Sequence, residues 1–434
     1  MARKRDKLKK LTVGWAGRTL ATGRMAASLG RAAAGKVASG SADGQRLGDA
    51  LLDELDAMKG LAMKVGQMVS YLDGSLPEDT QRVLRRLQRG SQPLPFAAVA
   101  PVVAASLGRP AEDVFDDIDE QPIAAASIGQ VHRATLHGRP VAVKIRYPGV
   151  EDTFAIDLGN FGRAGRLATL GTALDVPALV DELRTRLAEE CDYAREARAQ
   201  RLFVGLYADD PLTIVPDVVP EGCGDAVLTS DWIDGEGFYD FLDRAGTAER
   251  RAVAERLFRF SFTNIFQHGL LHGDPHPGNL LIPGGDAVAF LDYGCVRLFE
   301  RSHIETWKRL AWCILEDRRA DLPDVTADTG FVPDPDGYDW DAHWEVMRYL
   351  YEPFTTPGFV YTHDYVQRSY ELMSPKNPNW RRTAMPPAWL LTNRLQWGLN
   401  SILAMLGVEA DYPGWYRDCL SQPLQPAALP ESLS

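Results

Sequence analysis

The chain has 434 residues, of which 45% are hydrophobic and 24% are charged, and its formal net charge is −12. This much apolar surface is enough to form a core, which excludes a chain that is disordered throughout. No uncharged apolar stretch approaches the roughly 18 residues that a membrane-spanning helix needs. Five cysteines without paired spacing argue against a disulfide framework or a zinc ribbon and indicate a reducing, cytoplasmic compartment.

The charge is unevenly distributed along the chain. Residues 1–46 carry 11 Lys and Arg against two acidic residues, a local +9, so the remainder carries −21. An acidic body argues against nucleic-acid binding. The basic head contains apolar residues such as Leu11, Trp15 and Met25, a composition that suits peripheral contact with an anionic membrane surface. The same composition is also typical of a transit peptide and of a solvated, frayed terminus.

The first half of the chain changes from helical to strand periodicity. Apolar spacing predicts helices over 47–90, broken near Gly74 and Pro77, and a further short helix around Pro101. Alternation predicts two strands, over 128–134 and 140–145, that are joined by a turn at His137 and Gly138.

The second half is expected to be mainly helical. A long helix is predicted from Pro177 to about Phe203. The other expected elements are strands over 213–219 and 226–233, a helix over 236–270, a hairpin over 280–282 and 288–291, and helices to about 420. This order is α+β and helix-rich, and it lacks the alternation of a doubly wound sheet.

The strongest chemical signal is His-Gly-Asp-Pro-His-Pro-Gly-Asn at 272–279, followed by Asp-Tyr-Gly at 292–294. Phosphoryl transfer needs a carboxylate near the attacking oxygen and oxygen ligands for magnesium. We expect Asp274 to face the nucleophile, and Asn279 and Asp292 to hold Mg²⁺. A polar loop with capping Asp and Asn residues would not require both halves of this pattern.

A rival interpretation makes His268, His272 and His276 a metal-binding stripe on one helix face. Gly273 and the prolines that follow it make a helix there untenable, so we reject this stripe.

The second signal is Lys144 in the apolar run 141–145. A lysine in an apolar strand is costly unless it is paired, and in a kinase-like lobe such a lysine grips nucleotide phosphates and pairs with a helix Glu. The candidate partners are Glu190 and Glu196. Asp192 shares a helix face with Glu196, and exposed acidic residues on a helix are often simply solvated.

A third segment lies where a kinase has its Gly-rich phosphate loop. Alanines at Ala124, Ala125 and Ala126, followed by Ser127, stand in place of glycines. A Cβ limits close approach of the backbone to phosphate, so this loop is expected to be stiffer. The alternative is the ordinary start of an Ala-rich helix.

These motifs, in this order, resemble the UbiB (aarF-domain) family of atypical protein-kinase-like proteins. The family's K-x-G-Q motif matches residues 64–67. Lys64 and Gln67 carry no signal by themselves, and the resemblance makes them candidate site residues. Its E-x-D motif matches Glu190 and Asp192. The Ala-rich loop, the strand lysine and the two catalytic loops match as quoted above.

The resemblance implies a two-lobed kinase-like fold with an N-terminal helical extension that lays K-x-G-Q over the nucleotide site. It divides the chain into a basic extension, a helical extension with K-x-G-Q, a kinase-like N-lobe and a helical C-lobe, over 1–46, 47–110, 111–235 and 236–434. Lys64 is then expected to pair with Glu190 and Asp192. Asp231 is expected at the nucleotide-binding hinge, where relatives more often carry Glu.

The resemblance also implies the function: binding of ATP and Mg²⁺, with ATPase or small-molecule or lipid phosphotransferase activity. Support of isoprenoid-quinone or lipid metabolism at a membrane surface, through quinone or lipid precursors, is implied as well. The alternative is a nucleotide-gated scaffold, or pseudokinase, with little turnover; retention of Lys144, Asp274 and Asp292 favours chemistry. A kinase of the aminoglycoside or choline type would not need Lys64 or the Ala-rich loop.

Overall fold

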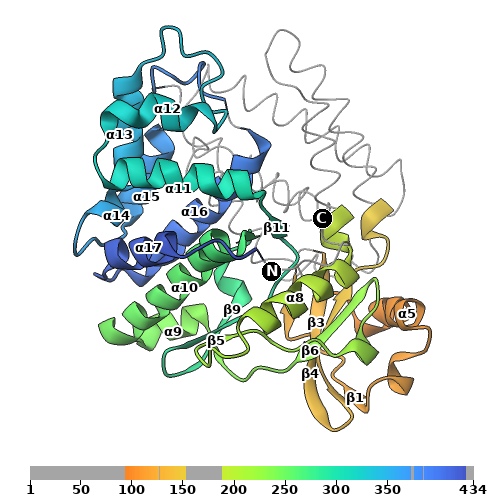
Figure 1. The fold of residues 1–434 in the computed structure, drawn as a ribbon. Coiled ribbons are helices and arrows are strands. Elements are labelled where there is room, and N and C mark those ends of the chain that lie inside the picture. The colour runs from red at the N-terminus through yellow and green to blue at the C-terminus, as the bar shows by residue number, and fades with distance from the viewer. Residues whose placement is uncertain (1–92, 127, 153–187, 373–375, 385, 427–434) are drawn as a thin grey trace, which may run out of the picture. The chain divides into compact units, whose positions relative to one another are not determined.

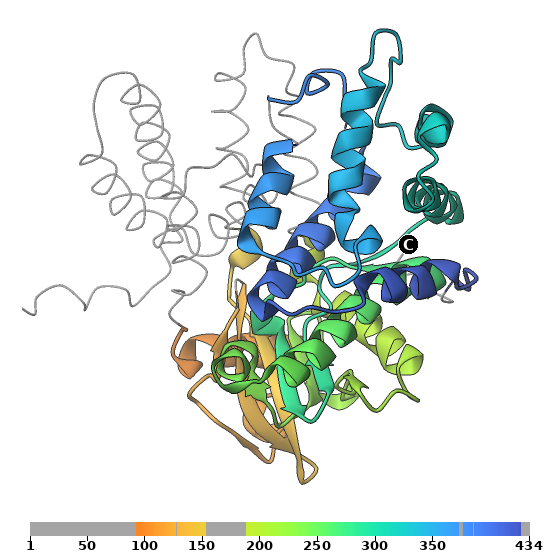
Figure 2. The same cartoon turned by 90° about the vertical axis from the view of Figure 1, so that its left-hand side faces the viewer.

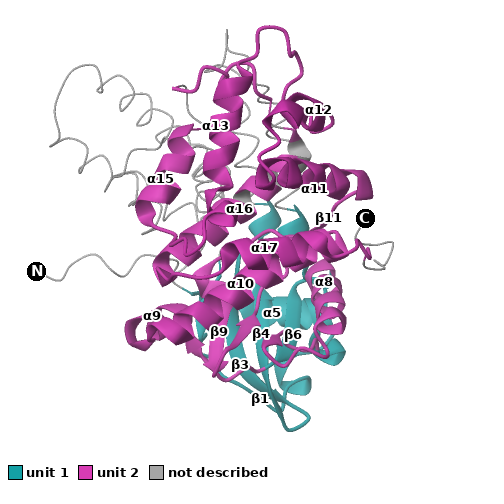
Figure 3. Ribbon diagram, turned by 60° about the vertical axis from the view of Figure 1, so that its left-hand side comes forward, with its two compact units in different colours: residues 1–70, 76–194, 219–231 teal, residues 71–75, 195–218, 232–434 magenta. Residues whose placement is uncertain are grey.

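The computed structural model describes residues 93–126, 128–152, 188–372, 376–384 and 386–426. The chain forms two compact units, which are coloured separately in Figure 3. Of the described residues, unit 1 contains 93–152, 188–194 and 219–231, and unit 2 contains the others. The predicted four-part linear division of the chain remains a prediction.

Unit 1 is built on an antiparallel sheet with the strand order β1-β3-β4-β6, and β2 pairs with the start of β3 on the same edge that β1 uses further along. The strands are β1 (Asp117–Ile118), β2 (Ala124–Ala125), β3 (Gly129–Leu136), β4 (Arg139–Arg146) and β6 (Val227–Asp231). His137 and Gly138 connect β3 to β4 with φ values of 51° and 73°. Positive φ at both central residues is typical of a type I′ hairpin turn, and the pairing of β3 with β4 confirms the predicted hairpin.

Strand alternation decides which face of β4 is buried. Val141, Val143 and Ile145 are 0% exposed, and α5 (Phe96–Leu107) packs on β4 and β6. Helix α5 contributes the buried Val99 and Val103 to this layer. Lys144 therefore lies on the opposite face of the strand from this core.

The predicted long helix is interrupted. In the described part, residues 188–191 are helical, Asp192 is not, and α8 runs over Tyr193–Leu206. The Tyr193 amide donates to the Asp225 carbonyl at 3.2 Å, which replaces an acceptor within a helix. The prediction of one continuous helix through Asp192 was wrong, because a loop carbonyl competes for the helical donor.

Unit 2 contains two small sheets. One has the order β5-β10-β9-β7, from β5 (Thr213–Ile214), β7 (Glu236–Gly237), β9 (Leu280–Gly284) and β10 (Ala287–Phe290). The other pairs β8 (Leu270–His272) with β11 (Val296–Leu298). The predicted β9–β10 hairpin is confirmed, whereas the strand predicted over 213–219 is shorter than expected.

Helix α10 (Thr247–His268) is the central helix of unit 2 and contacts α11, α16, α17 and strand β8 (Figures 1 and 2). The helix predicted over 236–270 is in fact α9 (Phe238–Arg244) and α10, separated at Ala245 and Gly246. The other helices are α11 (Arg301–Leu315), α12 (Leu322–Ala327), α13 (Trp340–Leu350), α14 (Glu352–Thr355), α15 (His363–Leu372), α16 (Pro387–Leu406) and α17 (Tyr412–Ser421).

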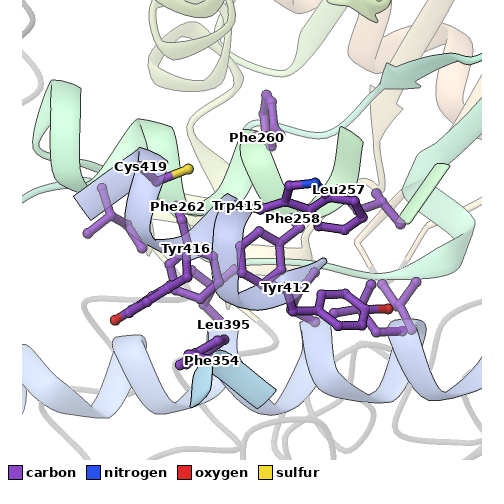
Figure 4. Close-up of a cluster of buried hydrophobic side chains, with 14 of the residues drawn as sticks. Leu257, Phe258, Phe260, Phe262, Phe354, Leu395, Tyr412, Trp415, Tyr416 and Cys419 are labelled. Carbon is purple, nitrogen blue, oxygen red and sulfur yellow. The ribbon is translucent and has the colours of Figure 1, made fainter. Parts of the chain in front are cut away.

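Aromatic side chains dominate the core of unit 2 (Figure 4). Phe258 lies 4.7 Å from Phe262 and 5.8 Å from Trp415, ring centre to ring centre, and Phe354 stacks on Tyr416 at 4.0 Å. This cluster ties α10 to α14 and α17, so the helix that leads to β8 is firmly anchored. None of the described helices combines the length and apolar character that crossing a membrane requires.

Gly129 is predicted to tolerate no side chain. A Cβ at this position would lie 2.5 Å from the Ile145 carbonyl oxygen and 2.6 Å from Tyr193 Oη. Gly129→Ala should therefore lower the free energy of unfolding by about 2 kcal/mol through overpacking, measured by urea denaturation. Gly205→Ala is the matched control, because nothing lies within 4 Å of its added Cβ; equal losses in both variants would contradict the assignment.

A second stability prediction concerns pH. His343 on α13 is buried, its Nδ1 lies 2.9 Å from Tyr338 Oη, and burial lowers its pKa to about 4. The folded state thus binds fewer protons than the unfolded state below pH of about 6.5. The free energy of unfolding should fall by about 3 kcal/mol on this account as the pH drops from about 6.5 to 4. In the variant His343→Gln this part of the pH dependence should be missing from urea titrations; an unchanged slope would contradict it.

Candidate active site

Two loops of unit 2 are brought together by backbone hydrogen bonds. Strand β8 leads into Gly273, whose amide donates to the Cys295 carbonyl at 2.7 Å. The β9–β10 hairpin then returns the chain, and the Leu291 amide donates to the Asn279 carbonyl at 3.0 Å. Pairing of β8 with β11 places His272 opposite Val296. The two halves of the sequence motif therefore meet, although the hairpin separates them along the chain.

Asp274 and Asn279 lie within one loop that ends in a short 3-10 turn, Pro277–Asn279. Asn279 Nδ2 donates to Asp274 Oδ2 at 3.3 Å. The amide nitrogen therefore faces the aspartate, which leaves Asn279 Oδ1 as the atom suited to ligate a cation.

Asp292 begins the second loop, and both its backbone carbonyl and its side chain form hydrogen bonds. Its Oδ1 accepts a hydrogen bond from the Gly294 amide at 3.0 Å. Its carbonyl lies 2.6 Å from His272 Nε2. Burial lowers the pKa of His272, so the ring is neutral and Nε2 carries the proton that it donates to Asp292. His272 thus adds a side-chain bond to the backbone bonds that join the two loops.

The donor set fits magnesium. Carboxylate and amide oxygens are the ligands that Mg²⁺ prefers, and it is usually held by one or two carboxylates together with substrate phosphates. Asp292 and Asn279 carry such oxygens, and the bond from the Leu291 amide to the Asn279 carbonyl joins their chain segments. Across the described ranges, no group of three or more His, Cys, Asp and Glu side chains forms a self-contained metal site.

The rejected histidine stripe is indeed absent from the described residues. His268 ends α10, His272 lies in β8, and His276 Nδ1 accepts a hydrogen bond from the Gly278 amide at 3.0 Å. The three rings serve three different local purposes.

Glu196 belongs to unit 2 and lies against the Asp-Tyr-Gly loop. Its side chain is 2% exposed, and Oε1 accepts from the Tyr293 amide at 3.4 Å. A Cβ added to Gly294 would lie 3.6 Å from Glu196 Oε2. The structure therefore brings Glu196 together with Asp292–Gly294, a contact that sequence reasoning did not predict.

Lys144 belongs to unit 1, as do Glu190 and Asp192. Its ammonium lies 5.1 Å from the centre of the Tyr193 ring, close enough for a cation–π contact. In the sheet, Lys144 is opposite Val131 on β3 and Leu228 on β6. The pairing of Lys144 with a helix Glu remains a prediction.

The Ala-rich segment is a strand. Ala124 pairs with Val131 and Ala125 with Gln130, and the Ala126 amide donates to the Gly129 carbonyl at 2.9 Å. The alternative of a helix start is therefore wrong, because these backbone groups form a tight turn between antiparallel strands. The exposed side chains of Ala124 and Ala125 are free of core packing.

Asp231 ends β6 and accepts two hydrogen bonds from Arg139, at 2.6 and 2.8 Å. Both oxygens of the Asp231 carboxylate are therefore hydrogen-bonded to the Arg139 guanidinium. A role of Asp231 in nucleotide binding remains a prediction. Lys64, Gln67 and Ser127 lie outside the described residues.

Sequence reasoning quoted His272 and Tyr293 as parts of their motifs but gave them no role, although His272 bonds the second loop and Tyr293 is fully buried. It likewise gave no role to Arg195, which donates to the Val296 carbonyl at 3.0 Å. Burial between motifs distant in sequence carries no local signal.

The antiparallel sheet of unit 1, the helical unit 2 and the paired Asp274 and Asp292 loops define a protein with a kinase-like fold. Residues 86–322 match the ABC1 atypical kinase-like domain. The chain belongs to this family of atypical kinases, the UbiB family that its motifs resemble.

Known relatives agree with this assignment. The chain is 32% identical to the mitochondrial atypical kinase COQ8 of Saccharomyces cerevisiae, over 76% of this chain and 69% of the yeast protein. It is 32% identical to mitochondrial COQ8B of Rattus norvegicus, over 71% of this chain but 59% of the rat protein. The solved complex of Rv3197 with erythromycin from Mycobacterium tuberculosis matches with a TM-score of 0.65 and 28% identity, over 89% of this chain and 97% of that one.

Proposed function

We propose that this protein binds ATP with Mg²⁺ and transfers the terminal phosphoryl group to water or to a small-molecule or lipid acceptor. The observation that carries the proposal is the joining of the Asp274–Asn279 loop to the Asp292 loop by the bonds described above. This constellation supplies oxygen ligands and a general base within one rigid framework.

Each residue has a distinct role in this proposal. Asp292 and Asn279 hold the magnesium ion, which neutralises charge on the phosphates when it is bound. Asp274 orients the attacking hydroxyl and accepts its proton. The family resemblance assigns Lys144 to the nucleotide phosphates, with Glu190 or Glu196 as its candidate partner, and assigns the loop at Ala124–Ala126 to cover the phosphates.

We propose that residues of the K-x-G-Q and E-x-D motifs, together with Asp231, complete the nucleotide site. Asp231 lies at the hinge, where β6 ends, and contributes there through its main chain. Lys64 and Gln67 are proposed to lie over the site and pair with Glu190 and Asp192, which would exclude a protein substrate.

We further propose a setting at a membrane surface. The basic residues 1–46 would contact anionic lipid, and the acceptor would be a quinone or lipid precursor. Relatives named as mitochondrial or chloroplastic proteins are consistent with membrane-rich organelles. The erythromycin complex of the Mycobacterium tuberculosis relative adds a second class of bulky, weakly polar ligand to test.

The decisive experiment measures ATP hydrolysis by the purified protein with and without Mg²⁺, anionic liposomes and phenolic quinone precursors. Magnesium-dependent turnover that liposomes or phenols increase would support the proposal. Tight ATP binding without turnover under every condition would favour the nucleotide-gated scaffold instead.

A further inference from the structure

The segment after α17 lies across the end of α10, within unit 2. We call residues 422–425 the C-terminal strap. Lys308 Nζ on α11 donates to the Gln422 carbonyl at 2.5 Å. The Gln425 amide donates to the Gln267 carbonyl on the last turn of α10 at 2.7 Å. Both ends of the strap are therefore attached to helices of the same unit.

The strap satisfies groups that a helix end leaves without partners. The last four carbonyls of an α-helix lack donors within the helix. The Gln425 amide donates to one of these carbonyls, that of Gln267. The backbone of Gln425 also faces the His268 ring, and its contact opposes the lowering of the His268 pKa by burial. Both contacts use the backbone of Gln425, so they do not depend on its side chain.

The strap also reaches the turn that feeds the catalytic strand. Gly269 follows α10 in the left-handed conformation, with φ of 69°, and β8 begins at the next residue. Leu424 packs against the core, and its Cδ1 lies 3.8 Å from the position of a Cβ on Gly269. On its other side, the Gly269 carbonyl accepts from the Phe299 amide at 2.8 Å. Gly269 is thus clamped between the strap and the end of β11.

The prolines in and after the strap restrict its backbone conformation. Pro423 lies inside it and Pro426 directly follows it. Each proline fixes its own φ and restricts the residue before it, so little conformational entropy is lost when the strap docks.

We propose that the C-terminal strap is a positioning element for the catalytic loop. It fixes the Gly269 turn, hence the placement of β8, the His272–Asp292 bond and the approach of Asp274. The role in catalysis rests on the proposed phosphoryl transfer. The mechanical coupling from Gln425 to β8 does not.

The test compares Gln425→Pro with Gln425→Ala in the full chain. Proline removes the amide donor to Gln267, whereas alanine keeps both backbone contacts. We expect amide exchange at 270–273 to become about fivefold faster in Gln425→Pro, as for the loss of one hydrogen bond. We also expect kcat for ATP hydrolysis to fall severalfold at unchanged KM, and Gln425→Ala to behave as wild type.

Truncation provides a second comparison. Removal of 427–434 keeps the strap and should leave exchange and kcat unchanged, whereas removal of 422–434 should reproduce Gln425→Pro. Wild-type exchange at 270–273 in Gln425→Pro would overturn the proposal, and so would faster exchange with unchanged kcat. Absence of turnover in the wild type would refute the proposed function and the catalytic part of this proposal, while the exchange data would still decide the coupling.

Discussion

Asp292→Asn should abolish the stabilisation of the protein by Mg-ATP. The substitution removes the negative charge that would face the metal and the phosphates. Asparagine keeps an Oδ1 that can accept from the Gly294 amide, as Asp292 does at 3.0 Å, so the ligand-free protein should unfold at nearly the wild-type temperature. Ligand at about 100 times its Kd stabilises by about 3 kcal/mol, and this increment should disappear from thermal unfolding curves.

The matched control is Asp286→Asn. Asp286 is exposed at the tip of the β9–β10 hairpin, so this variant loses the same charge from a nearby part of the chain without touching the site. It should keep the full Mg-ATP shift. A normal shift in Asp292→Asn would show that the metal ligand has been assigned wrongly.

Asp274→Asn should separate binding from turnover. We propose that Asp274 orients the attacking group, so its loss should reduce ATP hydrolysis by a factor of about 10² to 10⁴. The variant should still show the thermal shift with Mg-ATP, because Asp292 and Asn279 remain. The measurement is initial-rate hydrolysis beside thermal unfolding of the same preparation.

Hydrolysis at the wild-type rate in Asp274→Asn would remove the catalytic role of this residue. If the wild type does not hydrolyse ATP, and both it and Asp274→Asn bind Mg-ATP, the result would support the scaffold function instead. Loss of the thermal shift as well would indicate that Asp274 is a metal ligand, contrary to the assignment.

The local parts of the fold were predictable from sequence. The His137–Gly138 turn and the β9–β10 hairpin each combine strand alternation with residues that accept positive φ. The meeting of Asp274 with Asn279 was predictable because few residues separate them and the loop chemistry is distinctive. The kinase-like fold followed from the order of motifs along the chain.

The non-local parts were not predictable. Strands β8 and β11 have three residues each, too few for a period to be recognised, and each is defined only by its partner. The break at Asp192 depends on a carbonyl at Asp225, which no local pattern reveals. The packing of Glu196 against Tyr293 is likewise a product of tertiary structure.

The length of the β9–β10 hairpin sets the sequence interval between the Asn279 and Asp292 motifs, which matters when related proteins are sought by sequence pattern. In this chain the proposed metal ligands Asn279 and Asp292 are 13 positions apart (292 − 279). Their proximity, however, is set by the bond from Leu291 to Asn279 and by the β8–β11 pair, while the tip at Gly284, Gly285 and Asp286 is exposed. Insertions at this tip should leave the site geometry intact, since exposed loop tips tolerate added residues. A search pattern that fixes the interval would therefore discard functional homologues, whereas one that leaves it open would retain them.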